Sequence, residues 1–453
     1  MQRKTKRAME KNPEKAQRKI AAKKLRKTEK KMRIGLRANL KNTTPYAGLY
    51  PVLKFTLDEV MQNVLNNVSL EKKSMDDVKQ KQILSCLSLA FIGADKLERA
   101  KLLQNDALLK NLFDLEVTNP ENISRFLQEF DFRTTTQLEL ENMNLAVKAI
   151  KKANLTHITI DIDSSVKSLE GNQEGARKGY NPENIGNNCH NILFAFVEEI
   201  KVFVGGYIRP GNTGTGNGAV ELVQSIVSVL GEHVKEITFR FDCGYFSEEL
   251  IEAIESLNQK YVMRAKGYST LIENLRVQKD ALGWNDYKDG KELAAFRTKP
   301  DSWKKERRFI ASRIKKEKLI QLPLDSFDEY DYYFFVTNQE SWTEVDVVWF
   351  YDKRGNSENH IKECKYDFSV KTMTLHSFWA TQAMFQLQMM AYNILILFKL
   401  SKEELVSDLR ETAKTFRLKF IFVCGKIIFG SKQLILDISK DYAYKDTFFK
   451  LCS

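Results

Sequence analysis

The chain has 453 residues, of which 43% are hydrophobic and 29% charged, and its formal net charge is +12. This length and apolar content predict a soluble protein of several domains. Its six cysteines are scattered without a Cys-x-x-Cys pair, which argues against a zinc site or a disulfide framework and indicates a reducing compartment.

No signal peptide or membrane span is expected. The N-terminus lacks an apolar stretch, and the longest apolar run, residues 389–400, is shorter than the roughly 20 residues of a membrane span. This run follows three glutamines, Gln382, Gln386 and Gln388. We therefore interpret it as a buried helix and expect a cytoplasmic protein with no membrane partner.

The positive charge is concentrated at the N-terminus. Residues 1–33 contain 15 of the 71 basic and 3 of the 59 acidic residues, so the rest carries 56 of each sign. We expect residues 1–45 to form a basic arm, disordered or helical only when bound. Such an arm suits a phosphate backbone, although a purely solubilising tail fits the same composition.

Residues 46–153 have helical periodicity throughout. Thr56 followed by Glu59 has the form of a capping box that begins the first helix. Further helices are predicted at residues 78–91, 95–113, 123–130 and 136–153. We interpret this region as a helical DNA-binding domain, and a plain helical scaffold is the alternative.

Residues 158–165 read Ile-Thr-Ile-Asp-Ile-Asp-Ser-Ser and predict a strand. Alternation places Asp161 and Asp163 on one face and the isoleucines on the other, toward a core. Buried carboxylates are costly unless compensated, and a divalent metal is one possible compensation. A strand with an incidentally acidic exposed face is the simpler alternative.

The order of the following elements resembles a ribonuclease H-like sheet. A hairpin is predicted from residues 191–196 and 201–207, then a helix at 219–230 and a strand at 236–241 that ends on Asp242. A helix at 247–257 and a strand at 261–265 follow. In this α/β topology the first and fourth strands are neighbours, so Asp163 and Asp242 could approach each other.

The pattern loosens after residue 267, and we expect a β-rich module inserted at about residues 268–345. It contains Trp284, Trp303, basic clusters and an aromatic strand at 331–337. Basic residues interleaved with aromatics suit a surface that holds phosphates and stacks bases, whereas an ordinary solvated β-meander is the alternative.

Residues 347–351 are predicted to form a strand, and Asn356 or Ser357 to cap the next helix. Glu358 and Lys365 are seven residues apart and therefore share one helical face. A long helix at 376–400 completes a catalytic domain of residues 154–400. Strand-like segments at 420–424 and 426–429 belong to a C-terminal segment, residues 401–453.

Four residues then carry a resemblance to a known family. Tyr351, Arg354, Glu358 and Lys365 have the spacing Tyr-x2-Arg-x3-Glu-x6-Lys, which resembles the signature of bacterial insertion-sequence DDE transposases of the cut-and-paste, hairpin-forming type. Further similar stretches are residues 163–165, 173–182, 209–213, 217–218 and 240–246. The similarity covers roughly residues 50–430, and the basic arm is additional to it.

The resemblance implies a catalytic triad of Asp163, Asp242 and Glu358 that binds two Mg²⁺ ions, with Mn²⁺ as a possible substitute. Asp161 matches the position of the first acid less well than Asp163. The resemblance also implies that Tyr351, Arg354 and Lys365 grip phosphates at the transposon end. Further candidate DNA contacts are Arg209 and, for a base flipped out of the duplex, Trp303 or Trp284.

The function implied by the resemblance is DNA transposition. Such a protein binds terminal inverted repeats, cleaves the DNA strands and joins the ends to target DNA, and it acts as a homodimer on double-stranded DNA. Two alternatives remain: a metal-dependent DNA nuclease on the same fold, and a DNA-binding protein whose catalysis has decayed. Inverted repeats flanking the coding region would separate the transposase from the nuclease.

Overall fold

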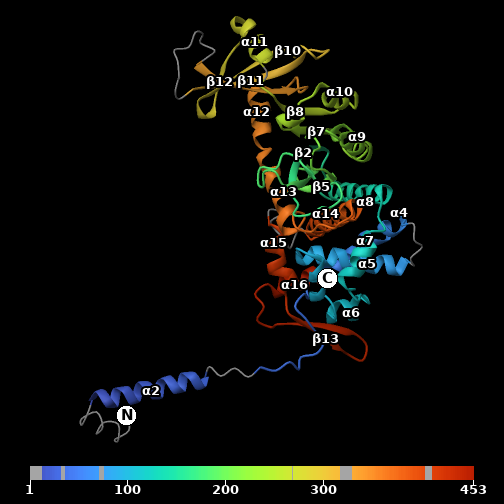
Figure 1. Ribbon diagram of the computed structural model, residues 1–453, viewed down its shortest axis with the longest axis vertical. Coiled ribbons are helices and arrows are strands. Elements are labelled where there is room, and N and C mark those ends of the chain that lie inside the picture. Colours follow the sequence, from blue (N-terminus) through green and yellow to red (C-terminus); the bar gives the residue numbers. More distant parts are fainter. Residues whose placement is uncertain (1–12, 32–35, 71–75, 268, 317–328, 403–410) are drawn as a thin grey trace. The chain divides into compact units, whose positions relative to one another are not determined.

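The computed structural model describes residues 13–31, 36–70, 76–267, 269–316, 329–402 and 411–453 (Figure 1). Contacts divide the chain into two units, residues 1–41 and residues 42–453. The first unit contains a helix, α2 (Pro13–Lys31), in the basic arm where we expected order only on binding. Proline at its first position and Glu14 in its first turn both favour a helix start.

The second unit begins with helices, as predicted. They are α3 (Leu49–Thr56), the π-helix η1 (Leu57–Met61), α4 (Gln62–Asn67), α5 (Asp76–Ile92), the 3-10 helix η2 (Leu97–Leu102), α6 (Ala107–Phe113), α7 (Pro120–Leu127) and α8 (Phe132–Lys152). The predicted capping box at Thr56 is wrong, because the helix already begins at Leu49 and the Thr56 hydroxyl donates to the carbonyl of Val52. The predicted helix at 95–113 is divided in two, and Asp106 caps its second part.

The central sheet has the ribonuclease H-like order. Its strands are β2 (His157–Ser168), β3 (Arg177–Lys178), β4 (Asn188–Val197), β5 (Val202–Gly205), β6 (Ile208–Pro210), β7 (Glu236–Phe241) and β8 (Lys260–Ala265). β4 pairs antiparallel with β2 and, on its other side, with β5 and β6. β7 lies parallel between β2 and β8. The first and fourth main strands, β2 and β7, are therefore neighbours, as predicted.

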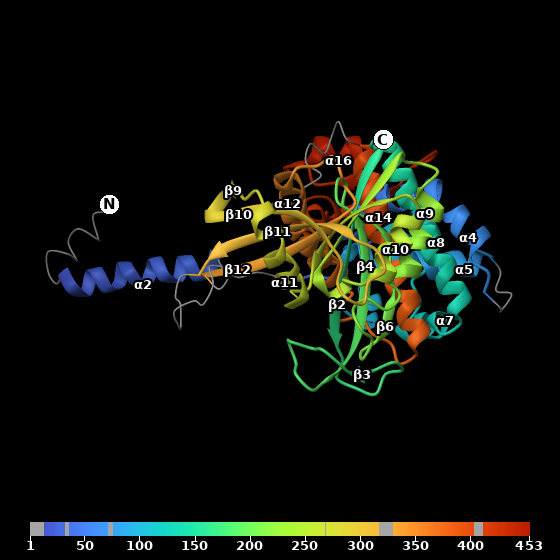
Figure 2. The same ribbon diagram turned by 90° about the horizontal axis from the view of Figure 1, so that it is seen from above.

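Helices cover both faces of this sheet. α9 (Ala219–Leu230) and α10 (Glu248–Ser256) lie on one side, and α12 (Glu344–Asp352) and α13 (Gly355–Asp367) lie on the other (Figures 1 and 2). The short 3-10 helix η3 (Cys243–Tyr245) follows β7. α13 contacts β2 and β4, so it approaches the strand that carries Asp163.

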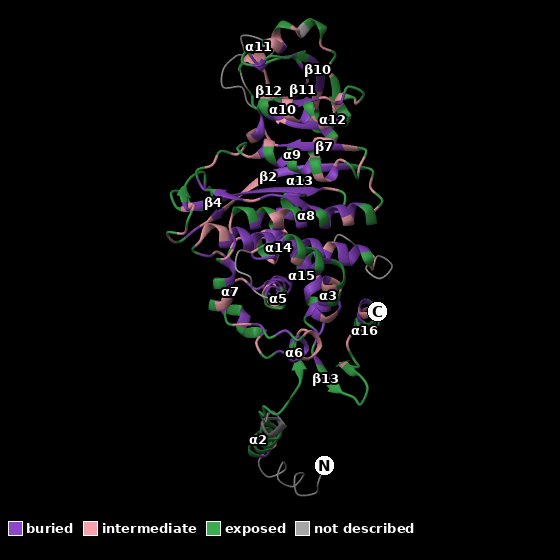
Figure 3. Ribbon diagram, turned by 90° about the vertical axis from the view of Figure 1, so that its right-hand side faces the viewer, coloured by how far each residue is buried: buried purple, intermediate pink, exposed green. Residues whose placement is uncertain are grey.

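The long helix α14 (Phe378–Ser401) is buried almost throughout (Figure 3). By length and composition it could cross a membrane, but 94% of its apolar window is buried inside the protein. Two of its buried side-chain amides hydrogen-bond to backbone groups at the edge of the sheet. Gln382 accepts from the backbone amide of Ile208, and Asn393 accepts from that of Phe203. The helix thus combines an apolar surface with the hydrogen bonds that a buried strand edge requires.

The predicted boundary near residue 153 does not separate two cores. α14 packs against α5 and α8 as well as β5, and one hydrophobic cluster includes residues from the N-terminal helices and from the sheet. Asn142 on α8 donates to the side-chain oxygen of Gln386 on α14 at 2.9 Å. The N-terminal helices and the sheet therefore form one packed body.

The inserted module continues the central sheet. It comprises α11 (Ser269–Val277), the 3-10 helices η4 (Lys279–Ala281) and η5 (Lys288–Gly290), and the strands β9 (Asn285–Tyr287), β10 (Lys291–Thr298), β11 (Arg307–Lys315) and β12 (Tyr330–Thr337). β12 pairs antiparallel with β8, and β11, β10 and β9 follow in order.

The predicted strand at 347–351 is wrong, because this segment lies in helix α12. Thr343 and Asp346 form a capping box at its start. Val347 and Val348 pack with Phe335 and Leu293 of the module. A run of five apolar residues fits a buried strand and a segment of a packed helix equally well, and the cap and the packing surface select the helix.

The C-terminal segment contains α15 (Ala413–Phe416), the π-helix η7 (Arg417–Ile421), β13 (Gly425–Phe429), β14 (Leu434–Ile438) and α16 (Lys445–Cys452). β13 pairs with β14 and with β1 (Thr43–Thr44), which joins the two ends of the second unit. The predicted strand near 426–429 is confirmed, whereas the one predicted at 420–424 is wrong: residues 420–421 lie in η7, and residues 422–424 form neither a helix nor a strand.

Candidate active site

Asp163 and Asp242 lie at the same edge of the sheet, because β2 and β7 are parallel and Ile162 pairs with Phe241. Each carboxylate is oriented by a backbone amide that follows it. Ser164 donates to Asp163 and Gly244 to Asp242, both at 2.8 Å. The two acids are thus fixed as neighbours on the face covered by α12 and α13.

Arg354, between α12 and α13, bridges the two acids. Its Nη2 lies 2.7 Å from Oδ2 of Asp163 and 3.7 Å from Oδ2 of Asp242. Burial raises the pKa of Asp163 to about 6; the charge of Arg354 opposes this shift, whereas Asp242 and Glu358 add to it. The site therefore concentrates negative charge that a cation must balance.

Glu358 lies in the first turn of α13 and is exposed. Its charge acts on Asp163, so it belongs to the same electrostatic site. Within the described part of the chain, however, no three Asp, Glu, His or Cys side chains are grouped closely enough to hold a metal ion. The structure thus brings two of the three predicted triad residues together and leaves the third at the margin.

Lys365 and Tyr351 flank the acids from the two helices. The ammonium of Lys365 donates to the Ser165 hydroxyl at 3.0 Å, two residues after Asp163. The ring of Tyr351 packs on Phe335 with centroids 4.9 Å apart. Burial raises the pKa of Tyr351 to about 12, so its hydroxyl remains a neutral donor near neutral pH.

Asp161 has a structural position. It is buried and forms a two-point ion pair with Arg240 of β7, at 2.6 and 2.7 Å. Arg240 also donates to the carbonyl of Phe350, the residue before Tyr351, at 2.7 Å. The pair therefore links β2 and β7 to the end of α12, next to the turn that carries Arg354.

Arg209 does not lie where a DNA contact would require. It is buried, and its guanidinium donates to Asn191 at 2.6 Å and to the carbonyl of Thr215 at 3.1 Å. We predicted a DNA contact for Arg209, but these bonds instead hold the loop that follows β6. Arginine suits a phosphate contact, but the Arg209 guanidinium is buried and already hydrogen-bonded within the protein.

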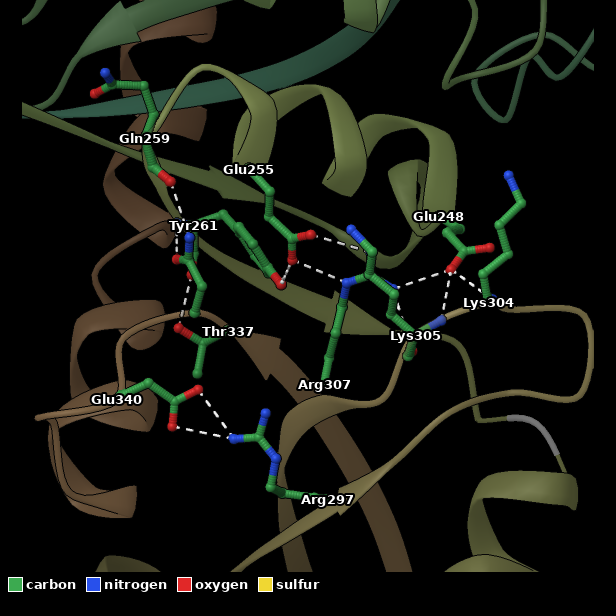
Figure 4. A network of polar contacts seen from close by, with 11 residues as sticks. Glu248, Glu255, Gln259, Tyr261, Arg297, Lys304, Lys305, Arg307, Thr337 and Glu340 are labelled. Carbon is green, nitrogen blue, oxygen red and sulfur yellow. Dashed lines mark hydrogen bonds and ion pairs between the residues drawn. The ribbon is translucent and has the colours of Figure 1, made fainter.

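Trp303 is also a core residue rather than an accessible ring. It is 7% exposed and packs on Phe246, with ring centroids 4.9 Å apart. Its neighbour Arg307 forms ion pairs with Glu248 and Glu255 of α10 (Figure 4). This network attaches the module to α10, and Trp303 in this position cannot receive a flipped base.

Trp284 is more accessible than Trp303. Its half-buried ring lies 3.9 Å from the guanidinium carbon of Arg313, a cation–π contact. Of the two predicted tryptophans, Trp284 is therefore the one with a ring edge at the surface.

A groove of about 570 Å³ opens beside the two acids. Its lining includes Asp163 and Asp242 together with Lys178, Tyr180 and the loop of residues 211–215. We did not single out Lys178 and Tyr180 from the sequence beyond their place in a family-like stretch. The sequence alone does not show that an exposed tyrosine and a lysine without a carboxylate partner among the described residues line the same groove.

Arg264 on β8 is a second residue that the sequence did not indicate. Phe241 pairs with Met263 and Arg264 with Phe335, so Arg264 lies in the row beside Asp242 and on the same face. Its guanidinium lies 5.0 Å from the ring of Tyr333. Among the described residues it has no carboxylate partner, unlike Arg240, Arg307 or Arg354.

The acids at this edge fit a divalent cation in chemistry and in placement. Carboxylate oxygens are the ligands that Mg²⁺ prefers, and the guanidinium between Asp163 and Asp242 shows that this position accommodates positive charge. Asp163 and Asp242 would hold such an ion, and Glu358 lies close enough to act on Asp163 electrostatically.

A ribonuclease H-like sheet with two acids side by side, where the pairing of β2 with β7 ends, defines a class of proteins that act on phosphodiesters. A family model described as "Transposase DDE domain group 1" matches residues 54–453. The chain therefore belongs to this family of DDE transposases.

Two other comparisons are less direct. No curated protein matches the chain. Among solved structures it is similar to the piggyBac transposase in a synaptic complex with hairpin DNA, with 12% identity and a TM-score of 0.47. That match covers 81% of this chain and 78% of the other.

Proposed function

We propose that this protein is an active DNA transposase that binds the terminal inverted repeats of its element, cleaves the DNA strands there and joins the ends to target DNA. The observation that carries the proposal is the position of Arg354, which belongs to the Tyr-Arg-Glu-Lys signature and lies between Asp163 and Asp242. One residue of the signature thus lies between the two acids that the resemblance implied as catalytic.

We infer that Asp163, Asp242 and Glu358 are the catalytic acids and hold two Mg²⁺ ions, for which Mn²⁺ would substitute. When bound, such ions activate a water or a 3′-hydroxyl and stabilise the leaving oxygen. Glu358 would complete the set by a movement of the first turn of α13. Its exposure supports this role, because no packing holds its side chain away from the acids.

The remaining signature residues would hold the DNA. Arg354 has a planar fork that can exchange carboxylates for phosphate oxygens, and Lys365 is held beside the end of β2 by Ser165. Tyr351 is a neutral hydroxyl donor at the same place. These groups would orient the scissile phosphate over the acids. The positive charges of Arg354 and Lys365 would lower the electrostatic cost of bringing the polyanionic DNA to the carboxylates.

The larger context follows from the chemistry of transposition. Two element ends must be brought together, so we infer a homodimer on double-stranded DNA. The basic arm supplies charge for the phosphate backbone. A cytoplasmic protein associated with the nucleoid is consistent with these roles.

The test is cleavage of labelled DNA that carries the element's own terminal repeats, with Mg²⁺ and with EDTA. Wild type should cut at the repeat boundary only with the metal. Asp163→Asn, Asp242→Asn and Glu358→Gln should bind the same DNA without cutting it. Cutting at random positions would indicate a nuclease, and binding without cutting by wild type would indicate a decayed DNA-binding protein. Retained cutting by any variant would refute that residue's role.

A further inference from the structure

The groove beside the acids has a wall that the proposed chemistry does not use. We define this wall as Lys178 and Tyr180, which line the same groove as Asp163 and Asp242. We propose that this wall holds an unpaired nucleotide next to the scissile phosphate, with the base stacked on Tyr180 and a phosphate neutralised by Lys178. This inference rests on the proposed function and specifies the form of DNA that the site takes.

Tyr180 is unusual in its exposure. Its side chain is 82% exposed, whereas Tyr245, which follows Asp242 closely in the chain, is 1% exposed. A ring left in water contributes nothing to the core. It does offer an aromatic face, and stacking on such a face accepts any base because every base has a π-surface.

The backbone that carries Tyr180 is held tightly in place. A Cβ on Gly179 would lie 1.8 Å from the carbonyl oxygen of Gly211, so only glycine permits this approach of two chain segments. Gly211 has the same constraint, since its Cβ would lie 2.2 Å from the carbonyl oxygen of Cys189. The residue before Tyr180 is therefore locked against the loop that lines the groove.

The residue after Tyr180 is anchored as well. Asn181 is 4% exposed, and its side-chain oxygen accepts from the Ser168 hydroxyl and from the backbone amide of Asn184, both at 3.2 Å. Ser168 is the last residue of β2, the strand of Asp163. An exposed ring between two fixed points is preorganised for a ligand, because little conformational entropy is lost on binding.

The charge of the wall suits a phosphate. Lys178 is exposed and has no carboxylate within ion-pair distance among the described residues, whereas the nearby Lys371 pairs with Glu183 at 2.6 Å. An unpaired ammonium beside an aromatic ring is the combination that single-stranded DNA sites use. Bases within a duplex are already stacked on their neighbours, so the wall favours unpaired over paired nucleotides.

The experiment uses the full chain and a fluorescein-labelled 12-residue oligothymidylate with one central 2-aminopurine. Anisotropy measures affinity, and 2-aminopurine emission measures stacking. Tyr180→Ala should weaken binding about tenfold and abolish the quenching that stacking produces, whereas Tyr180→Phe should retain both. Ile185→Ala is the matched control, since Ile185 is 91% exposed on the same segment but does not line the groove.

Three results would overturn the inference: unchanged quenching in Tyr180→Ala, an equal loss in Ile185→Ala, or an equal loss of affinity for a duplex of the same length. The proposed function fails separately. If wild type cuts at the repeat boundary while Tyr180→Ala shows normal quenching, only the stacking wall is refuted. If wild type does not cut but quenching depends on Tyr180, the wall stands as a nucleic-acid site and transposition is refuted.

Discussion

The guanidinium of Arg354 lies 2.7 Å from the carboxylate of Asp163 and 3.7 Å from that of Asp242. Two carboxylates at neighbouring strand ends repel each other, and a shared cation relieves that repulsion. Because a side chain of the protein takes this position, a divalent ion must compete with it. The same arginine would be free to turn toward a phosphate once the acids are neutralised.

Replacement of Arg354 by glutamine should therefore strengthen divalent metal binding in the absence of DNA. We expect Arg354→Gln to bind Mn²⁺ about tenfold more tightly, corresponding to about 1.4 kcal/mol. Calorimetric titration with Mn²⁺ measures this directly. Arg297→Gln is the control, because Arg297 pairs with Glu340 on the module's surface. An unchanged or weaker affinity in Arg354→Gln would contradict the competition.

The raised pKa of Asp163, about 6, predicts a pH-dependent difference in stability from Asp163→Asn. Between about pH 4 and 6 the folded protein holds a proton that the unfolded chain has released, so the unfolding free energy of wild type falls as pH rises. Asparagine does not titrate. Relative to the variant, metal-free wild type should lose up to about 3 kcal/mol between pH 4 and 7, less where water reaches the carboxyl group. Urea unfolding at several pH values tests this, and a difference independent of pH would contradict it.

The buried pair of Asp161 and Arg240 predicts a large loss of stability on Asp161→Asn. The substitution removes the closer of two carboxylates that pair with the buried guanidinium and leaves Glu198, at 3.5 Å, as the remaining one, so we expect a cost of up to about 3–5 kcal/mol. Glu116→Ala breaks an exposed pair with Lys110 and should cost less than about 1 kcal/mol. Denaturant unfolding of both variants provides the comparison, and similar small costs would show that Arg240 finds another partner.

Arg264 is expected to contact the DNA backbone near the acids. Arg264→Ala should weaken binding of any duplex sequence and should reduce the slope of log affinity against log salt by about 1. Arg297→Ala, with its carboxylate partner on the module, should leave the slope unchanged. Filter binding at several salt concentrations measures the slopes, and a sequence-dependent loss would indicate a base contact instead.

Gly179→Ala should disrupt the wall of the groove, because the added Cβ would overlap the carbonyl of Gly211. We expect a destabilisation of about 1–3 kcal/mol and loss of single-strand binding. Gly283→Ala has no heavy atom within 4 Å of the new Cβ and serves as the control. A Gly179→Ala protein with wild-type stability and binding would show that the two segments separate at no cost.

Local patterns determined much of this protein. The helix at 219–230 and the strand at 236–241 have the predicted bounds: the helix buries one regular face, and the strand is an apolar run buried on both faces. The resemblance of Tyr351, Arg354, Glu358 and Lys365 to the family signature in residue type and spacing, together with the further similar stretches, predicted the family. The family match over residues 54–453 confirms that inference.

Only the tertiary structure decided how residues of one type divide between function and architecture. Asp161 and Asp163 share a strand face, yet the register against β7 places Arg240 beside the first. Arg209 and Trp303 have suitable chemistry for DNA, but packing buries both, whereas it leaves Tyr180 exposed. Sequence determines which groups are available and with what period, and burial and cross-strand partners depend on contacts between segments far apart in the chain.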